Sequence, residues 1–274
     1  MAAYSRLARR LAGQPGQAGR PALVLLHGFT QTSRSWAPLV ERLGQRHSLV
    51  LPDAPGHGGS ASVRADLWAT ADLLAGTLAE LVAGPAGWVG YSMGGRMALH
   101  VALAHPDKVG RLVLISTTAG MEGPADRKAR RASDEALALR IEEGGREGLG
   151  EFLGEWLAQP LFATLPASAA GLEARMANTP AGLASSLRLA GTGAQVPLWE
   201  RLGELGERAL PVLVVAGALD TKYCEHARRM ASAIGPGAQL LIVEGAGHAC
   251  HLEKPAQVAA AIADFCAWPG PGKA

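Results

Sequence analysis

The pentapeptide Gly90-Tyr91-Ser92-Met93-Gly94 constrains the fold of this chain more than any other segment. An apolar run precedes it and a helix-like stretch follows it, so its serine lies where a strand turns sharply into a helix. Bulky side chains beside the serine would clash in so tight a turn. The pattern therefore predicts a strand–turn–helix unit that holds an exposed serine hydroxyl at the edge of a sheet.

Apolar runs alternate with helical stretches along most of the chain. We interpret as strands the runs at residues 22–26, 49–51, 87–90, 109–115, 212–216 and 239–243. The helical stretches are 35–43, 67–82, 97–104, 225–233 and 256–266. This alternation indicates an α/β fold with a mostly parallel sheet covered on both faces. Function in such sheets gathers at the carboxyl ends of the strands.

The alternation breaks between residues 120 and 200. This stretch has helical periodicity, five prolines and no convincing strand. We therefore expect one domain whose core comprises residues 1–119 and 201–274, with residues 120–200 inserted as a helical lid over the strand ends. The Pro-Gly-Pro-Gly tail at 269–272 is expected to be disordered.

Composition excludes several classes of protein. A chain of 274 residues, 48% of them hydrophobic, is long enough to bury a full core, and its net charge of +2 implies no nucleic-acid partner. No apolar run is long enough to span a membrane, and no signal peptide is recognisable. Three cysteines without metal-ligand spacing argue against a disulfide scaffold and fit a reducing cytoplasm. No metal or organic cofactor is implied, and the oligomeric state is not readable.

Two later strands end in residues that complement the serine. The run 212–216 leads to Asp220, and the run 239–243 leads to His248, which gives the chain order Ser, Asp, His. Ser92 would supply the reactive oxygen, His248 would be its base, and Asp220 would orient the imidazole. A lone aspartate after a strand is usually a helix N-cap, and a lone histidine is usually structural. Three such residues in this order, each at a strand end, predict a catalytic triad.

The first strand ends in His27-Gly28-Phe29, a loop that could aim a backbone N–H at the same pocket. The amides of Phe29 and Met93 would then form an oxyanion hole, although Gly28 could simply permit a tight turn. We expect His57, in a glycine-rich loop, to be structural because the position of the base is already filled. His251 could line the site or only pack, and Cys250 is expected to be a bystander.

Together these residues resemble the α/β-hydrolase fold superfamily across nearly the whole chain. The resemblance is carried by the runs Leu25-Leu26-His27-Gly28-Phe29, Asp53-Ala54-Pro55-Gly56-His57-Gly58-Gly59-Ser60, Gly90-Tyr91-Ser92-Met93-Gly94-Gly95 and Gly245-Ala246-Gly247-His248. It implies a central sheet flanked by helices. It does not specify the activity, because this fold hosts many chemistries. Serine at the elbow argues against the aspartate-nucleophile branch of epoxide hydrolases and haloalkane dehalogenases.

Other segments resemble a narrower family, the 2-succinyl-6-hydroxy-2,4-cyclohexadiene-1-carboxylate synthases of menaquinone biosynthesis. They are Gly28-Phe29-Thr30, Tyr91 with Arg96, Arg127-Lys128-Ala129-Arg130-Arg131, residues 156–162, Gly191-Thr192-Gly193 and Asp220-Thr221-Lys222-Tyr223. In that family the triad serine is thought to act as a base, removing a proton and triggering elimination of pyruvate without hydrolysis. The resemblance implies substrate contacts at Tyr91, Arg96, Arg130, Trp156 and Arg175.

The arginines fit a small anionic substrate. The planar guanidinium binds carboxylates bidentately, and Arg96 lies one helical turn after Ser92, on the same side. For Arg130 and Arg175, a solvated helix face is the alternative. Cys250 stands where the family is expected to have a small apolar residue.

Three functions remain open at this stage. The first is the pyruvate-eliminating lyase, and the second is a serine carboxylesterase or C–C bond hydrolase in which Ser92 is a covalent nucleophile. The third is a ligand receptor on the same fold, which an intact triad disfavours.

Overall fold

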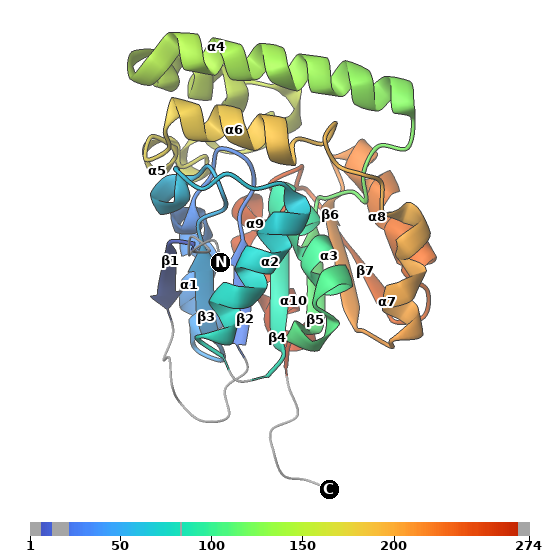
Figure 1. The fold of residues 1–274 in the computed structure, drawn as a ribbon. Coiled ribbons are helices and arrows are strands. Elements are labelled where there is room, and N and C mark those ends of the chain that lie inside the picture. Colours follow the sequence, from blue (N-terminus) through green and yellow to red (C-terminus); the bar gives the residue numbers. More distant parts are fainter. Residues whose placement is uncertain (1–6, 13–21, 83, 268–274) are drawn as a thin grey trace, which may run out of the picture.

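The computed structural model describes residues 7–12, 22–82 and 84–267 (Figure 1). They form a seven-stranded sheet in the order β1-β3-β2-β4-β5-β6-β7. Its first strand pairs antiparallel with β3, and every other pair is parallel. The strands are β1 (Arg9–Ala12), β2 (Ala22–Leu26), β3 (Ser48–Pro52), β4 (Ala86–Tyr91), β5 (Val109–Ile115), β6 (Val212–Gly217) and β7 (Ala238–Val243).

Helices cover both faces of this sheet because its central strands are apolar on both sides. In β2, Val24 and Leu26 pack into one core cluster while Leu23 and Leu25 pack into the other. The first cluster lies under α2 (Leu67–Ala79), α3 (Met93–Ala104), α7 (Gly203–Glu207) and α8 (Thr221–Ile234). The second lies under α1 (Ala37–Gly44), α9 (Cys250–Glu253) and α10 (Pro255–Phe265).

Residues 120–200 contain helices and no strand. They include α4 (Pro124–Leu157), α5 (Leu172–Arg175) and α6 (Pro180–Ala190), and Figure 1 shows α4 and α6 stacked over one end of the sheet. The long α4 is kinked at Gly145, whose φ of 55° suits glycine. Its two arms and α6 share a separate apolar cluster, with Ile141, Phe152 and Leu183 among its members. We call residues 120–200 the insertion.

Several predicted boundaries were wrong. We predicted that a helix starts at residue 97, but α3 begins at Met93, directly after the serine. Gly94 and Gly95 lie in the first turn of this helix, where a side chain would not fit. A Cβ on Gly95 would lie 2.6 Å from Thr117 Cβ. Strand β1 was missed because it is short and half-exposed. The tail at 269–272 lies outside the described residues. Of the helices within the described ranges, none has the length and apolar character that crossing a membrane requires.

Candidate active site

Ser92 occupies the turn between β4 and α3. Its backbone has φ 51° and ψ −109°, a conformation that non-glycine residues rarely adopt. The flanking glycines permit this turn, since a Cβ on Gly90 would lie 2.6 Å from the Cα of Gly95. The glycine spacing around Ser92 therefore serves the close approach of strand and helix, as the pentapeptide predicts.

His248 links Ser92 to Asp220. Its Nε2 lies 3.2 Å from Ser92 Oγ, and its Nδ1 lies 2.7 Å from Asp220 Oδ2. The two carboxylate oxygens of Asp220 have separate tasks, because Oδ1 accepts the N–H of Tyr223 and caps α8. The N-cap role and the role toward histidine are thus both present at this aspartate. With the histidine side chain almost fully buried, the hydrogen bonds hold the ring between its two partners.

Both residues predicted to form the oxyanion hole lie beside Ser92. Phe29 and Met93 line the same cavity as the serine. Met93 is the first residue of α3, so its N–H points along the helix start, where no intrahelical acceptor exists. An N–H donor at this place suits a negative charge that develops next to Ser92 Oγ.

Two buried histidines support the loop that carries Phe29. His27 Nδ1 bonds Gly28 O at 2.8 Å, and its Nε2 accepts the N–H of Ala54 at 3.0 Å. His57 bonds Pro55 O through Nδ1 at 3.0 Å and accepts the N–H of Thr30 through Nε2 at 3.3 Å. Each ring accepts at one nitrogen and donates at the other, so both are neutral. Burial lowers the pKa of His57 to about 3, which keeps it uncharged and supports the structural role expected for it.

Asp53 and Asn178 complete this support. Asp53 accepts the N–H of Ser33 at 2.7 Å through one oxygen and that of Gly59 at 2.9 Å through the other. Asn178, which comes from the insertion, accepts from Gly58 at 2.9 Å and donates to Thr30 O at 2.6 Å. The four side chains His27, Asp53, His57 and Asn178 are called the loop brace below.

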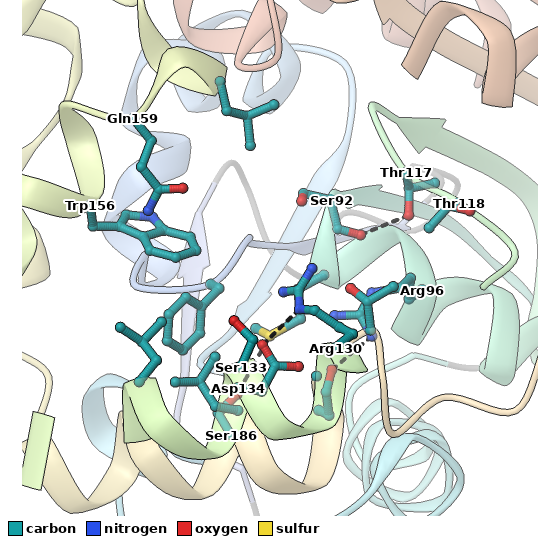
Figure 2. A pocket seen from close by; sticks show the side chains of 18 of the residues that line it. Ser92, Arg96, Thr117, Thr118, Arg130, Ser133, Asp134, Trp156, Gln159 and Ser186 are labelled. Carbon is teal, nitrogen blue, oxygen red and sulfur yellow. Dashed lines mark hydrogen bonds and ion pairs between the residues drawn. The ribbon is translucent and has the colours of Figure 1, made fainter. Parts of the chain in front are cut away.

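A cavity of about 370 Å³ opens in front of Ser92. Three of the residues predicted to bind substrate line it, namely Arg96, Arg130 and Trp156. Figure 2 shows Trp156 and Gln159 on the side of the cavity opposite Arg96, with Arg130 between them. The insertion supplies most of the wall that faces the serine.

Arg96 is a buried cation to which no carboxylate of the described residues is bonded. Its side chain is only 6% exposed, and Nη1 donates to Ala190 O at 2.7 Å and to Gln195 Oε1 at 3.4 Å. Burial lowers the pKa of Arg96 to about 10, so the guanidinium stays charged at neutral pH. A buried charge of this kind calls for an anionic partner.

Sequence reasoning missed two polar partners of these arginines, Asp134 in the lining of the cavity and Gln195 outside that lining. Asp134 accepts from Arg130 Nε at 2.8 Å, and Gln195 accepts from Arg96. Buried polar atoms remain without a partner in the described structure at Asp134 Oδ2, Gln195 Nε2 and Trp156 Nε1. The i,i+4 spacing of Arg130 and Asp134 was a signal that could have revealed the pair. Gln195 gave no local signal. The four residues Arg96, Asp134, Trp156 and Gln195 are called the cavity wall below.

Tyr91 and Arg175 are absent from the described residues that line this cavity. The ring of Tyr91 turns toward His251, with ring centroids 4.1 Å apart, and the side chain is buried. Arg175 donates to Ala170 O at 2.8 Å and to Thr30 Oγ1, so its guanidinium lies against the loop that carries Phe29 rather than on a solvated helix face. His251 packs against Tyr91 and Trp36, and Cys250 is buried beneath it.

Among the described residues, no group of three or more His, Cys, Asp or Glu side chains could hold a metal ion. The site therefore consists of a hydrogen-bonded Ser–His–Asp series, the loop that carries Phe29 and a cavity lined by Arg96 and Arg130. A model of the alpha/beta hydrolase family matches residues 23–261. The chain belongs to the alpha/beta hydrolase family. This membership confirms the expected fold.

The narrower resemblance is confirmed as well. The 2-succinyl-6-hydroxy-2,4-cyclohexadiene-1-carboxylate synthase of Salmonella paratyphi C is 35% identical over 254 residues, covering 92% of this chain and 96% of that protein. The structure of MenH from S. aureus has a TM-score of 0.84 at 29% identity, covering 94% of this chain and 97% of that one. A malate-bound thermophilic esterase from Thermogutta terrifontis has a TM-score of 0.77 at 28% identity, covering 94% and 92%.

Proposed function

We propose that this protein is a lyase of menaquinone biosynthesis that eliminates pyruvate and releases 2-succinyl-6-hydroxy-2,4-cyclohexadiene-1-carboxylate. The observation that carries the proposal is Arg96, a buried cation that faces the cavity of Ser92 without a bonded carboxylate. A site for neutral esters would have no need of it. The synthase of Salmonella paratyphi C named above, at 35% identity, supports the same reaction.

In this proposal Ser92, His248 and Asp220 act as a catalytic triad that moves a proton. His248 Nε2, 3.2 Å from Ser92 Oγ, takes the hydroxyl proton while the serine oxygen removes a proton from a ring carbon of the substrate. The electrons of the broken C–H bond enter the ring and break the bond to the pyruvyl oxygen, so pyruvate leaves as its enolate. Asp220 stabilises the imidazolium that forms.

The amides of Phe29 and Met93 would form the oxyanion hole for charge that develops during this step. Arg96 and Arg130 would hold substrate carboxylates, and Trp156 would donate its unpartnered indole N–H to the substrate. For Tyr91 and Arg175 we propose an indirect part in substrate binding. Arg175 supports the oxyanion loop through Thr30, and Tyr91 packs against the His248 ring, with ring centroids 5.4 Å apart.

Release of pyruvate from the enolpyruvyl intermediate tests the proposal. The wild-type protein should produce pyruvate and the cyclohexadiene in equal amounts. Arg96→Leu should lose affinity for the anionic substrate, whereas Arg42→Leu, a change on the remote helix α1, should not. Pyruvate release no faster than in buffer would rule the reaction out.

A serine carboxylesterase or C–C bond hydrolase is the second candidate, because its covalent mechanism needs the same hydrogen-bonded series. The similarity to a thermophilic esterase favours it. An acyl-enzyme separates the two functions. Stoichiometric labelling of Ser92 by a fluorophosphonate together with rapid p-nitrophenyl ester turnover would support the esterase. Slow ester cleavage would not, since an activated serine is often promiscuous.

We further propose a cytoplasmic location. The three cysteines Cys224, Cys250 and Cys266 are free and buried, which suits a reducing compartment. Detection of the activity in the soluble fraction of gently lysed cells, with none in the medium, tests this part of the proposal.

A further inference from the structure

A second cavity of about 310 Å³ adjoins the one at Ser92. Four residues line both cavities, namely Thr118, Arg130, Thr192 and Tyr223. The two spaces therefore meet at the side chain of Arg130. Arg130 therefore lies at the boundary between the two cavities.

Most charged groups around the second cavity are already engaged. Arg229 makes two contacts with Glu122, at 2.5 and 2.8 Å, and its guanidinium stacks 3.8 Å from the ring centroid of Trp199. Burial, followed by Lys222 and Arg229, lowers the pKa of His226, so this ring is neutral at neutral pH. Asp126 lies against Gly123 in the first turn of α4, where the helix dipole favours a carboxylate.

Lys222 is the exception. It lines the second cavity from the first turn of α8, two residues after Asp220. Within the described part of the chain, no carboxylate lies within ion-pair distance of its ammonium group. The lining of the second cavity around Lys222 is held in place, since Trp199 Nε1 donates to Gly120 O at 2.8 Å. The cavity thus offers one free cation on a fixed frame.

The substrate of the proposed reaction bears three carboxylates, one on the ring, one on the pyruvyl group and one at the end of the succinyl arm. The pyruvyl group must lie at Ser92 because its bond breaks there. The succinyl arm takes no part in bond breaking and is long enough to leave the ring's cavity. The cavity at Ser92 presents two arginines, Arg96 and Arg130, for three anionic groups.

We propose that the second cavity is the subsite for the terminal carboxylate of the succinyl arm, with Lys222 as its cation and Arg130 at the passage between the two cavities. The proposal rests on the proposed function for the identity of the arm. The chemical requirement is a flexible aliphatic carboxylate attached to a ring that is bound at Ser92.

A ligand pair tests the subsite without turnover. 2-Succinylbenzoate is the aromatic dehydration product of the proposed product and keeps both of its carboxylates, whereas 2-butanoylbenzoate has a methyl group in place of the terminal carboxylate. Calorimetry should show that Lys222→Ala weakens 2-succinylbenzoate by about fivefold and leaves 2-butanoylbenzoate unchanged. Lys222→Arg should bind both as wild type does. Lys128→Ala, an exposed lysine that lines neither cavity, is the matched control.

The outcomes separate the subsite from the reaction. Equal weakening of both ligands by Lys222→Ala, or no weakening of 2-succinylbenzoate, would overturn the subsite. So would failure of the wild type to bind 2-succinylbenzoate. Pyruvate release is measured independently. If Lys222→Ala weakens only 2-succinylbenzoate but the wild type releases no pyruvate, the subsite stands and the proposed reaction is wrong. If the wild type releases pyruvate but Lys222→Ala weakens neither ligand selectively, the reaction stands and the subsite is wrong.

Discussion

The loop brace and the cavity wall are two polar clusters that differ in how far their hydrogen bonds are satisfied. In the brace, every side-chain nitrogen and oxygen of His27, Asp53, His57 and Asn178 has a protein partner. On the wall, Asp134, Gln195 and Trp156 each keep a buried polar atom without one. One cluster is complete by itself, and the other keeps polar atoms that no described residue satisfies.

The difference separates stability from recognition. Buried polar atoms without partners destabilise a folded protein, so a cluster that keeps three of them is tolerated for another reason. The brace holds the loop that carries Phe29 in one geometry before substrate arrives. A substrate bound by the cavity wall then meets backbone donors that do not have to rearrange.

The largest effect is expected at Ser92, which belongs to neither cluster. Ser92→Ala should lower kcat by about 10³- to 10⁴-fold, because the oxygen that exchanges the proton with His248 is gone. The backbone strain at this position is the same for alanine, so the urea midpoint should match that of the wild type. A midpoint shift as large as the loss of rate would mean that Ser92 is chiefly a structural residue.

Breaking the brace should cost stability first. Asn178→Ala leaves the N–H of Gly58 and the carbonyl of Thr30 unsatisfied, at a cost of about 2–4 kcal/mol in the free energy of unfolding. Urea denaturation measures the loss. Thr179→Ala, which removes the N-cap of α6 next to it, is the control and should cost about 1 kcal/mol. A smaller loss for Asn178→Ala than for Thr179→Ala would contradict the assignment of the brace.

Disrupting the cavity wall should impair substrate binding more than stability. Arg96→Leu should raise KM by about 10- to 100-fold, because it removes the buried charge that would hold the substrate. It also leaves Ala190 O and Gln195 Oε1 without their donor, but relief of the buried charge offsets this cost, so the unfolding free energy should fall by less than in Asn178→Ala. Steady-state kinetics and urea denaturation on the same preparation check both halves. Arg96→Lys keeps the charge and loses the planar fork, so it should recover only part of the affinity. An unchanged KM in Arg96→Leu would remove the wall from substrate binding.

The Ser–His–Asp series and the cavity wall differ in how far the sequence predicts them. Ser92, Asp220 and His248 were predicted together because each follows a strand, and parallel strands bring their carboxyl ends to one edge. Arg96 followed from its place one turn along α3. Asp134 could have been found from its i,i+4 spacing to Arg130, whereas Gln195 could not be predicted, because its contact with Arg96 depends on how the insertion packs on the core.

Arg175 shows the same limit in another form. Its position in the sequence suggested either a substrate contact or a solvated helix face. The structure instead turns its guanidinium toward Thr30 and Ala170. That choice depends on contacts between residues far apart in the chain. Periodicity reports which face of a helix is buried, but it does not report which buried neighbour a long side chain will reach.

The smallest effect is the response of the brace to acid. The folded pKa of His57 is about 3, below its ordinary value of 6.5, because burial disfavours the charged ring. The unfolded chain therefore binds more protons in this range, so His57 contributes stability above pH 6.5 that is lost as the pH falls towards 3. Between pH 6.5 and about pH 5 this one group should cost about 2 kcal/mol. His57→Gln keeps an acceptor for Thr30 and a donor for Pro55 but does not titrate, so its unfolding free energy should fall less steeply with acid than that of the wild type. Equal slopes in urea denaturation would mean that the ring is charged in the folded state, and the brace would then lose the complete pairing that distinguishes it from the wall.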